Sequence, residues 1–107
     1  LMEDAGKRFE EELNKIEIKD ARVSFVNNVE AKFISDAGEI RKSLVRQMSE
    51  SVLWEDCVKI VSSSGVNSFI EVGPGKVLSG LIKRIEPSAK IFNVENLETL
   101  NKVVSEL

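Results

Sequence analysis

The sequence has 107 residues, 42% of them hydrophobic and 31% charged, which is the balance of a globular domain. Its net charge of -3, with both signs mixed along the chain, provides no basic face for nucleic acid. One cysteine and no histidine exclude an internal disulfide, a complete zinc site and a complete Ser-His catalytic pair. We find no membrane-spanning run and no export signal, so we expect a cytoplasmic chain with no metal and no cofactor.

An amphipathic helix and a short strand are predicted at the start of the chain. The apolar residues of the helix recur at helical spacing, at Met2, Ala5, Phe9, Leu13 and Ile16. No capping residue precedes this helix, so we expect the chain to be part of something longer. Residues 22–28 then predict a strand that ends at Asn27 and Asn28. These amides either bind a ligand or simply end the strand, because asparagine tolerates turn geometry.

Two helices are predicted in the middle of the chain. The first begins with Asp36 and Glu39, a variant of the capping box, and Gln47 lies near its far end. A glutamine at that place is most often a surface residue. The second helix has an apolar stripe over residues 54–61, and Cys57 on this stripe is most simply a small buried hydrophobe.

The central feature of the sequence is the stretch 69–78, an apolar run followed by Gly73, Pro74 and Gly75 and then by apolar residues at helical spacing. It predicts a strand, a tight turn and a helix. Such a turn is either a packing turn or a ligand site, since open α/β sheets bind ligands at the carboxyl ends of their strands. A further strand over residues 90–94 and a helix over residues 97–107 follow.

Strands that alternate with helices predict an α/β fold, here a partial parallel three-stranded sheet flanked by helices, in a single unit spanning residues 1–107. Three strands are few for such a sheet, which again indicates missing neighbours. Two nucleotide-binding motifs fail: the glycines do not have the spacing of the dinucleotide fingerprint, and Val77 stands where a phosphate loop needs serine or threonine.

Several stretches together resemble one family, namely Leu1-Met2 at the first helix, residues 26–29, residues 40–47 and residues 70–78. They are similar in order and spacing to the carboxyl-terminal third of malonyl-CoA:acyl-carrier-protein transacylase, an acyltransferase of fatty acid biosynthesis. The resemblance is weak beyond Pro87. It implies the carboxyl-terminal part of an α/β-hydrolase-like core, with malonyl-CoA, acyl carrier protein and the missing amino-terminal part of the same enzyme as partners.

The resemblance also implies roles for individual residues. Gln47 matches a glutamine whose main-chain carbonyl accepts the ring N–H of the catalytic histidine, and that histidine is absent from this chain. Asn28 and Asn27 match the position near the acyl and pantetheine channel. Gly75 and Val77 are similar to residues of the wall close to the histidine. The nucleophilic serine is also absent, so we expect this chain alone to be inactive. The alternative is a non-catalytic interaction module or a truncated product that retains the fold elements.

Overall fold

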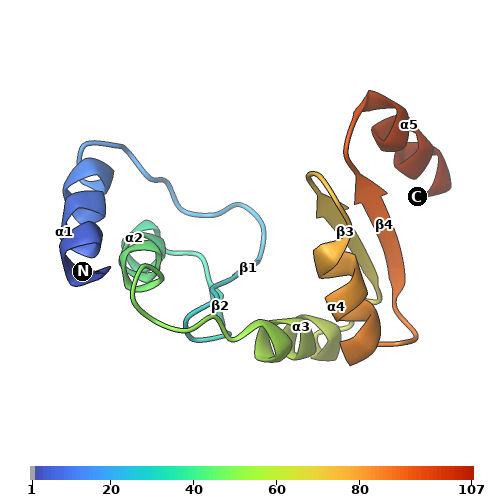
Figure 1. The fold of residues 1–107 in the computed structure, drawn as a ribbon, viewed down its shortest axis with the longest axis horizontal. Helices are drawn as coiled ribbons and strands as arrows, with labels where there is room; N and C mark the ends of the chain where they lie inside the picture. Colours follow the sequence, from blue (N-terminus) through green and yellow to red (C-terminus); the bar gives the residue numbers. More distant parts are fainter. Residues whose placement is uncertain (1) are drawn as a thin grey trace. The chain divides into compact units, whose positions relative to one another are not determined.

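The structure is a computed structural model that describes residues 2–107, so Leu1 of the resemblance lies outside the described residues. The chain forms two compact units, residues 1–60 and residues 61–107, each described below by itself. Both units contain helices and strands, as the α/β prediction requires, and in the second unit the two alternate (Figure 1). No helix within the described part combines the length and the apolar character needed to cross a membrane.

The first unit is built around helices α1 (Met2–Leu13) and α2 (Ala37–Arg46), which pack against each other. The Arg41 side chain donates hydrogen bonds from α2 to the carbonyl oxygens of Leu13 and Ile16, the latter at 3.0 Å. The Leu13 carbonyl, which also accepts from the Ile16 amide at 3.1 Å, ends α1, and the Ile16 carbonyl belongs to the segment after the helix. A long-range arginine therefore caps α1, and the helix ends earlier than the apolar spacing through Ile16 predicts.

The predicted strand over residues 22–28 is shorter than expected and pairs differently. It is reduced to β1 (Phe25–Val26), which pairs in antiparallel fashion with β2 (Phe33–Ile34), a strand that the sequence pattern does not predict. The two are joined by a turn in which Ala31 has a positive φ of 52°. The prediction that this strand joins a parallel sheet is therefore wrong within the described residues, because the turn brings β2 back beside β1 in the antiparallel direction.

Helix α2 begins as predicted, since the Asp36 side chain accepts a hydrogen bond from the Glu39 amide at 3.0 Å. Helix α3 (Trp54–Ser63) also has the predicted extent, and Cys57 and Val58 are buried on it. The core of the first unit consists of Leu13, Val29, Ile34, Cys57 and Val58. Cys57 is thus confirmed as a buried side chain.

The second unit contains the predicted strand, turn and helix. Strand β3 (Ser68–Val72) lies parallel to β4 (Lys90–Val94), with Ser68 opposite Lys90 and Val72 opposite Val94 (Figure 1). Helix α4 (Val77–Ile85) packs on both strands, and α5 (Leu97–Glu106) packs on β4. The parallel sheet of the described residues accordingly has two strands instead of the predicted three.

Candidate functional site

The five residues predicted to form the site are divided between the two units. Asn27, Asn28 and Gln47 belong to residues 1–60, whereas Gly75 and Val77 belong to residues 61–107.

Gln47 directly follows the last residue of α2 and is exposed. Its amide donates to the Ser43 carbonyl at 3.0 Å, and its φ of -61° and ψ of -21° keep it close to helical geometry. Its own carbonyl oxygen accepts no hydrogen bond from any residue that the structure describes. A carbonyl at a helix end, held in direction by the helix and free of an internal partner, can accept a hydrogen bond from another group.

Asn27 is 2% exposed, and its side chain is used within its own turn. Its Oδ1 atom accepts from the Glu30 amide at 2.8 Å, and its Nδ2 atom donates to Glu30 Oε1 at 3.3 Å. The main-chain carbonyl of Asn27 accepts from the Ala31 amide at 3.0 Å. An asparagine that closes a turn in this way shapes the loop, and its amide group faces the loop itself.

Asn28 is half-buried and connects the turn to the segment before α3. Its main-chain carbonyl accepts from the Leu53 amide at 2.8 Å, and its Oδ1 atom lies 3.8 Å from the Cys57 Sγ atom. The same thiol donates to the Asn27 carbonyl at 3.4 Å. Burial raises the pKa of the Cys57 thiol, and the negative charge of Asp56 adds to this effect. Cys57 is therefore a neutral thiol that holds both asparagines, a contact that the sequence pattern alone does not indicate.

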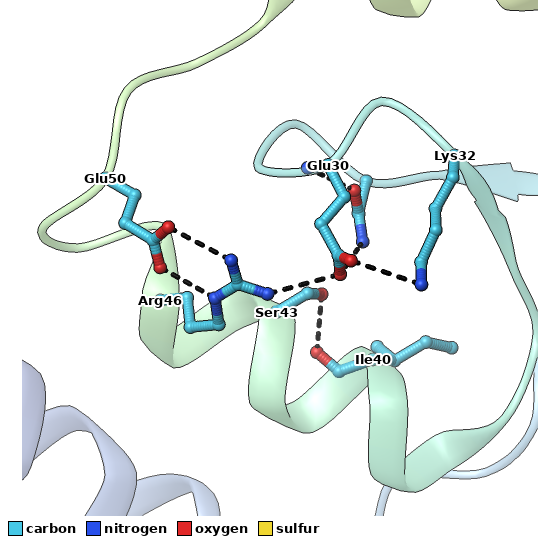
Figure 2. A network of polar contacts seen from close by, with 7 residues as sticks. Glu30, Lys32, Ile40, Ser43, Arg46 and Glu50 are labelled. Atoms are coloured by element: carbon cyan, nitrogen blue, oxygen red, sulfur yellow. Dashed lines mark hydrogen bonds and ion pairs between the residues drawn. The ribbon is translucent and has the colours of Figure 1, made fainter.

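A cluster of charged side chains surrounds the end of α2 (Figure 2). The Arg46 guanidinium binds Glu50 through two atoms, Nε to Oε2 at 2.6 Å and Nη2 to Oε1 at 3.0 Å, and binds Glu30 Oε1 through Nη1 at 3.2 Å. Lys32 Nζ lies 3.1 Å from Glu30 Oε2. The sequence contains one signal for this cluster, because Arg46 and Glu50 are four residues apart.

The pKa values in this cluster follow from the ion pairs. The hydrogen bond from Arg46 lowers the pKa of the Glu50 carboxyl, and Glu50 in turn raises the pKa of Arg46. The hydrogen bond from Lys32 is the main cause of the lowered pKa of Glu30. Glu30, Arg46 and Glu50 therefore remain charged at neutral pH. The cluster joins the Asn27 turn to the residue before Gln47.

The turn predicted from Gly73, Pro74 and Gly75 lies between β3 and α4. Gly73 and Gly75 have φ values of 133° and 81°, which favour glycine. The Gly75 amide donates to Glu95 Oε1 at 2.6 Å, and the Gly73 amide donates to the Val94 carbonyl at 2.9 Å. The turn is thus attached at two points to the segment that ends β4.

Val77 is the first residue of α4 and is 74% exposed. A Cβ atom built on Gly75 meets no other described atom within 4 Å. The described part of the chain thus leaves open space beside both residues. A group from elsewhere could occupy this space without displacing the turn.

A polar cluster beneath the turn escapes sequence analysis. Glu71 Oε1 accepts from the Ser79 amide at 2.9 Å, from the Ser79 hydroxyl at 2.7 Å and from Asn93 Nδ2 at 3.2 Å. The Ser79 hydroxyl is the main cause of the lowered pKa of the Glu71 carboxyl. Because its members come from β3, α4 and β4, no local pattern reveals it. The carboxylate caps the amide end of α4 from the neighbouring strand.

A cavity of about 250 Å³ lies between β4 and α5, and its polar lining includes Lys76, Glu95, Thr99 and Lys102. None of the five predicted site residues lines it. Within residues 2–107, no group of three or more histidine, cysteine, aspartate and glutamate side chains is placed to hold a metal ion. The predicted site therefore consists of a helix-end carbonyl and an asparagine turn in one unit, and of an exposed glycine turn in the other.

Comparison with known proteins identifies the relatives of this chain. It is 36% identical, over all of its 107 residues, to the malonyl CoA-acyl carrier protein transacylase of Bacillus subtilis, and 46% identical over 85 residues to that of Salmonella typhimurium. The chain resembles the malonyl CoA-acyl carrier protein transacylases. It spans about a third of their length, 34% of the Bacillus protein and 28% of the Salmonella protein. No protein-family model matches the chain.

Solved structures agree with this relationship to the transacylases. The chain superposes on an acyl carrier protein S-malonyltransferase from Vibrio cholerae with a TM-score of 0.87 and 34% identity, covering 94% of this chain and 33% of that one. It superposes on a malonyl-transacylase in complex with a type II PKS acyl-carrier protein with a TM-score of 0.91 and 33% identity, covering 99% and 34%. The α/β arrangement of the described elements therefore resembles about a third of these transacylase structures.

Proposed function

We propose that this chain is the carboxyl-terminal third of a malonyl-CoA:acyl-carrier-protein transacylase, an enzyme that transfers the malonyl group from coenzyme A to acyl carrier protein. The observation that carries the proposal is the match between the whole chain and about one third of the curated transacylases. The two units would belong to one acyltransferase domain that works in the cytoplasm. The chain would be inactive alone because it contains no histidine that could act as base.

In this proposal, Gln47 contributes its main-chain carbonyl to the catalytic machinery. The carbonyl would accept the N–H of one ring nitrogen of the catalytic histidine, which leaves the other nitrogen free to take the proton of the serine nucleophile. Support comes from the position of this carbonyl at the end of α2, where no described residue donates to it. A fixed carbonyl can thus hold the histidine without a carboxylate.

The other predicted residues would contact the acyl group and its pantetheine arm. Asn28 is the better placed asparagine, since its Nδ2 atom has no hydrogen-bond acceptor among the described residues, whereas the Asn27 amide is engaged within its turn. Gly75 and Val77 would form the wall close to the histidine. The open space beside them agrees with this role.

The rest of an α/β-hydrolase-like core would complete the parallel sheet. Ile70 and Val72 of β3 are 45% and 79% exposed, although both are large and apolar. Side chains of this kind are usually covered in a folded protein. Helices of the missing part would cover this face of the sheet, and strands beside β3 would bring the sheet to more than two strands.

A transfer assay on the complete protein that contains this chain tests the proposal. We expect the malonyl group to move from malonyl-CoA to acyl carrier protein, as measured by the mass of the carrier protein. Acetyl-CoA serves as the control donor, because it lacks the malonyl carboxylate. A folded complete protein that binds a partner chain but transfers no acyl group would instead support the non-catalytic interaction module.

A further inference from the structure

Arg46 occupies a place that connects the two parts of the predicted site in the first unit. It is the last residue of α2 and directly precedes Gln47. Its guanidinium reaches forward to Glu50 and across to Glu30, which belongs to the turn closed by Asn27 (Figure 2). We infer that Arg46 is a positioning residue that directs the Gln47 carbonyl toward the catalytic histidine, an inference that rests on the proposed function.

The first argument is the closure of the segment that contains Gln47. The Arg46 carbonyl accepts from the Ser49 amide at 3.1 Å and from the Glu50 amide at 3.0 Å. The side chains of Arg46 and Glu50 also join the two ends of this five-residue segment through two hydrogen bonds, at 2.6 and 3.0 Å. Main chain and side chains together thus hold the segment on both sides of Gln47, which restricts the direction of its carbonyl.

The second argument is the connection to the asparagine turn. Glu30 Oε1 accepts from Arg46 Nη1 at 3.2 Å and from Asn27 Nδ2 at 3.3 Å, while the Glu30 amide donates to Asn27 Oδ1 at 2.8 Å. Asn28 follows directly in the chain. Arg46 therefore links the carbonyl predicted to hold the histidine to the asparagine predicted to contact the acyl group.

The third argument distinguishes positioning from stability. Ion pairs between exposed side chains contribute little to folding, and the side chains of Arg46, Glu30 and Glu50 are 45%, 34% and 43% exposed. A planar guanidinium with three contacts nevertheless fixes geometry better than a lysine ammonium, whose single charge has no preferred plane. Catalysis is sensitive to small displacements that stability barely registers. The expected signature is a slower chemical step in a protein that remains folded.

The test uses single-turnover malonylation of the complete protein by malonyl-CoA. The amplitude of the reaction reports the folded fraction, and the rate constant reports the geometry of the base. For Arg46→Gln we expect an unchanged amplitude, an unchanged malonyl-CoA concentration for half-maximal rate, and a rate constant about tenfold lower. Arg46→Lys should lie between Arg46→Gln and the wild type. Glu50→Gln, which removes the two-atom contact but leaves α2 intact, should be about threefold slower.

The matched control is Glu55→Gln, which breaks an ion pair of the same i, i+4 spacing, Lys59 Nζ to Glu55 Oε1 at 3.1 Å on α3. We expect its rate constant to equal that of the wild type. Rate constants for Arg46→Gln and Glu50→Gln that equal the control would overturn the inference, as would a loss confined to the amplitude. A wild-type protein that accepts no malonyl group would instead refute the proposed function, so the two failures are distinguishable.

Discussion

The two units of this chain are determined by different kinds of interaction. In residues 61–107, strand β3, the glycine turn, α4, β4 and α5 all occur where the local apolar pattern predicts them. In residues 1–60, two strands have only two residues each, α1 ends at a cap that Arg41 provides from far along the sequence, and the Asn27 turn is closed by polar groups three residues apart. Local periodicity thus predicts one unit well and the other only in part.

The difference has a physical cause. A parallel pair of five-residue strands with a connecting helix is long enough for both the strand period and the helix period of apolar residues to appear in the sequence. A two-residue strand contains only one period of the strand pattern, so no repeat distinguishes Phe33 and Ile34 from a loop. The elements of the first unit are instead positioned by hydrogen bonds of specific polar groups. Substitutions at such groups in either unit test whether this difference between the units is real.

The largest effect is expected at Gln47, where the main chain matters and the side chain does not. In the complete protein, Gln47→Pro removes the amide that donates to Ser43 and places a ring against the preceding turn. We expect a loss of about 3 kcal/mol in the free energy of unfolding, together with loss of malonyl transfer. Gln47→Ala retains the carbonyl and should remain active. Equal transfer rates for the two folded variants would contradict the role of the carbonyl.

The next effect is expected at Glu71, which tests whether the second unit also depends on a polar cluster. Its lowered pKa means that the ionised carboxylate stabilises the fold above the ordinary glutamate pKa of 4.5, and that this stabilisation is lost as the pH falls through the lower folded-state pKa. At neutral pH, Glu71→Gln should lower the melting temperature by several degrees, and the difference from wild type should shrink in acid. Glu11→Gln, at an exposed position of α1, is the control. A pH-independent difference between Glu71→Gln and the wild type would exclude the carboxylate as the cause.

A smaller effect is expected at Gly75, where a matched glycine is available. Gly75 and Gly65 both have positive φ values, 81° and 102°, and a Cβ atom on either meets no described atom within 4 Å. Alanine at each position should therefore cost about 1 to 2 kcal/mol of stability through backbone strain alone. If the turn forms the wall of the acyl site, only Gly75→Ala should also slow transfer per folded molecule. Equal normalised rates would leave the turn with a structural role only.

The smallest effect is expected at Cys57, whose thiol holds the asparagine turn. Cys57→Ala removes a weak donor and a small buried group, and we expect a loss of about 1 kcal/mol, measured by denaturant unfolding. Cys57→Ser, which retains a donor, should recover part of this loss. If Cys57→Ser is no more stable than Cys57→Ala, then Cys57 contributes through packing and not through its hydrogen bond to Asn27.

Much of the fold can be predicted from the sequence, and particular residues show which features cannot. The Asp36 cap and the turn at Gly73 and Gly75 are predicted and confirmed, because each depends on neighbours in the chain. The Glu71, Ser79 and Asn93 cluster joins three elements and has no local signature. The roles of Gln47, Asn27, Asn28, Gly75 and Val77 stay predictions drawn from the resemblance. No spacing in the sequence distinguishes a carbonyl that binds a histidine from one that faces water.

The central claim is that this chain supports an acyl transfer whose nucleophile lies outside it. The most direct measurement is peptide mapping by mass spectrometry, after the complete protein has reacted with malonyl-CoA in the absence of acyl carrier protein. The account predicts one malonyl ester per molecule, on a serine outside residues 1–107. A stable malonyl group on any residue within 1–107, or a folded protein that acquires none, would contradict it.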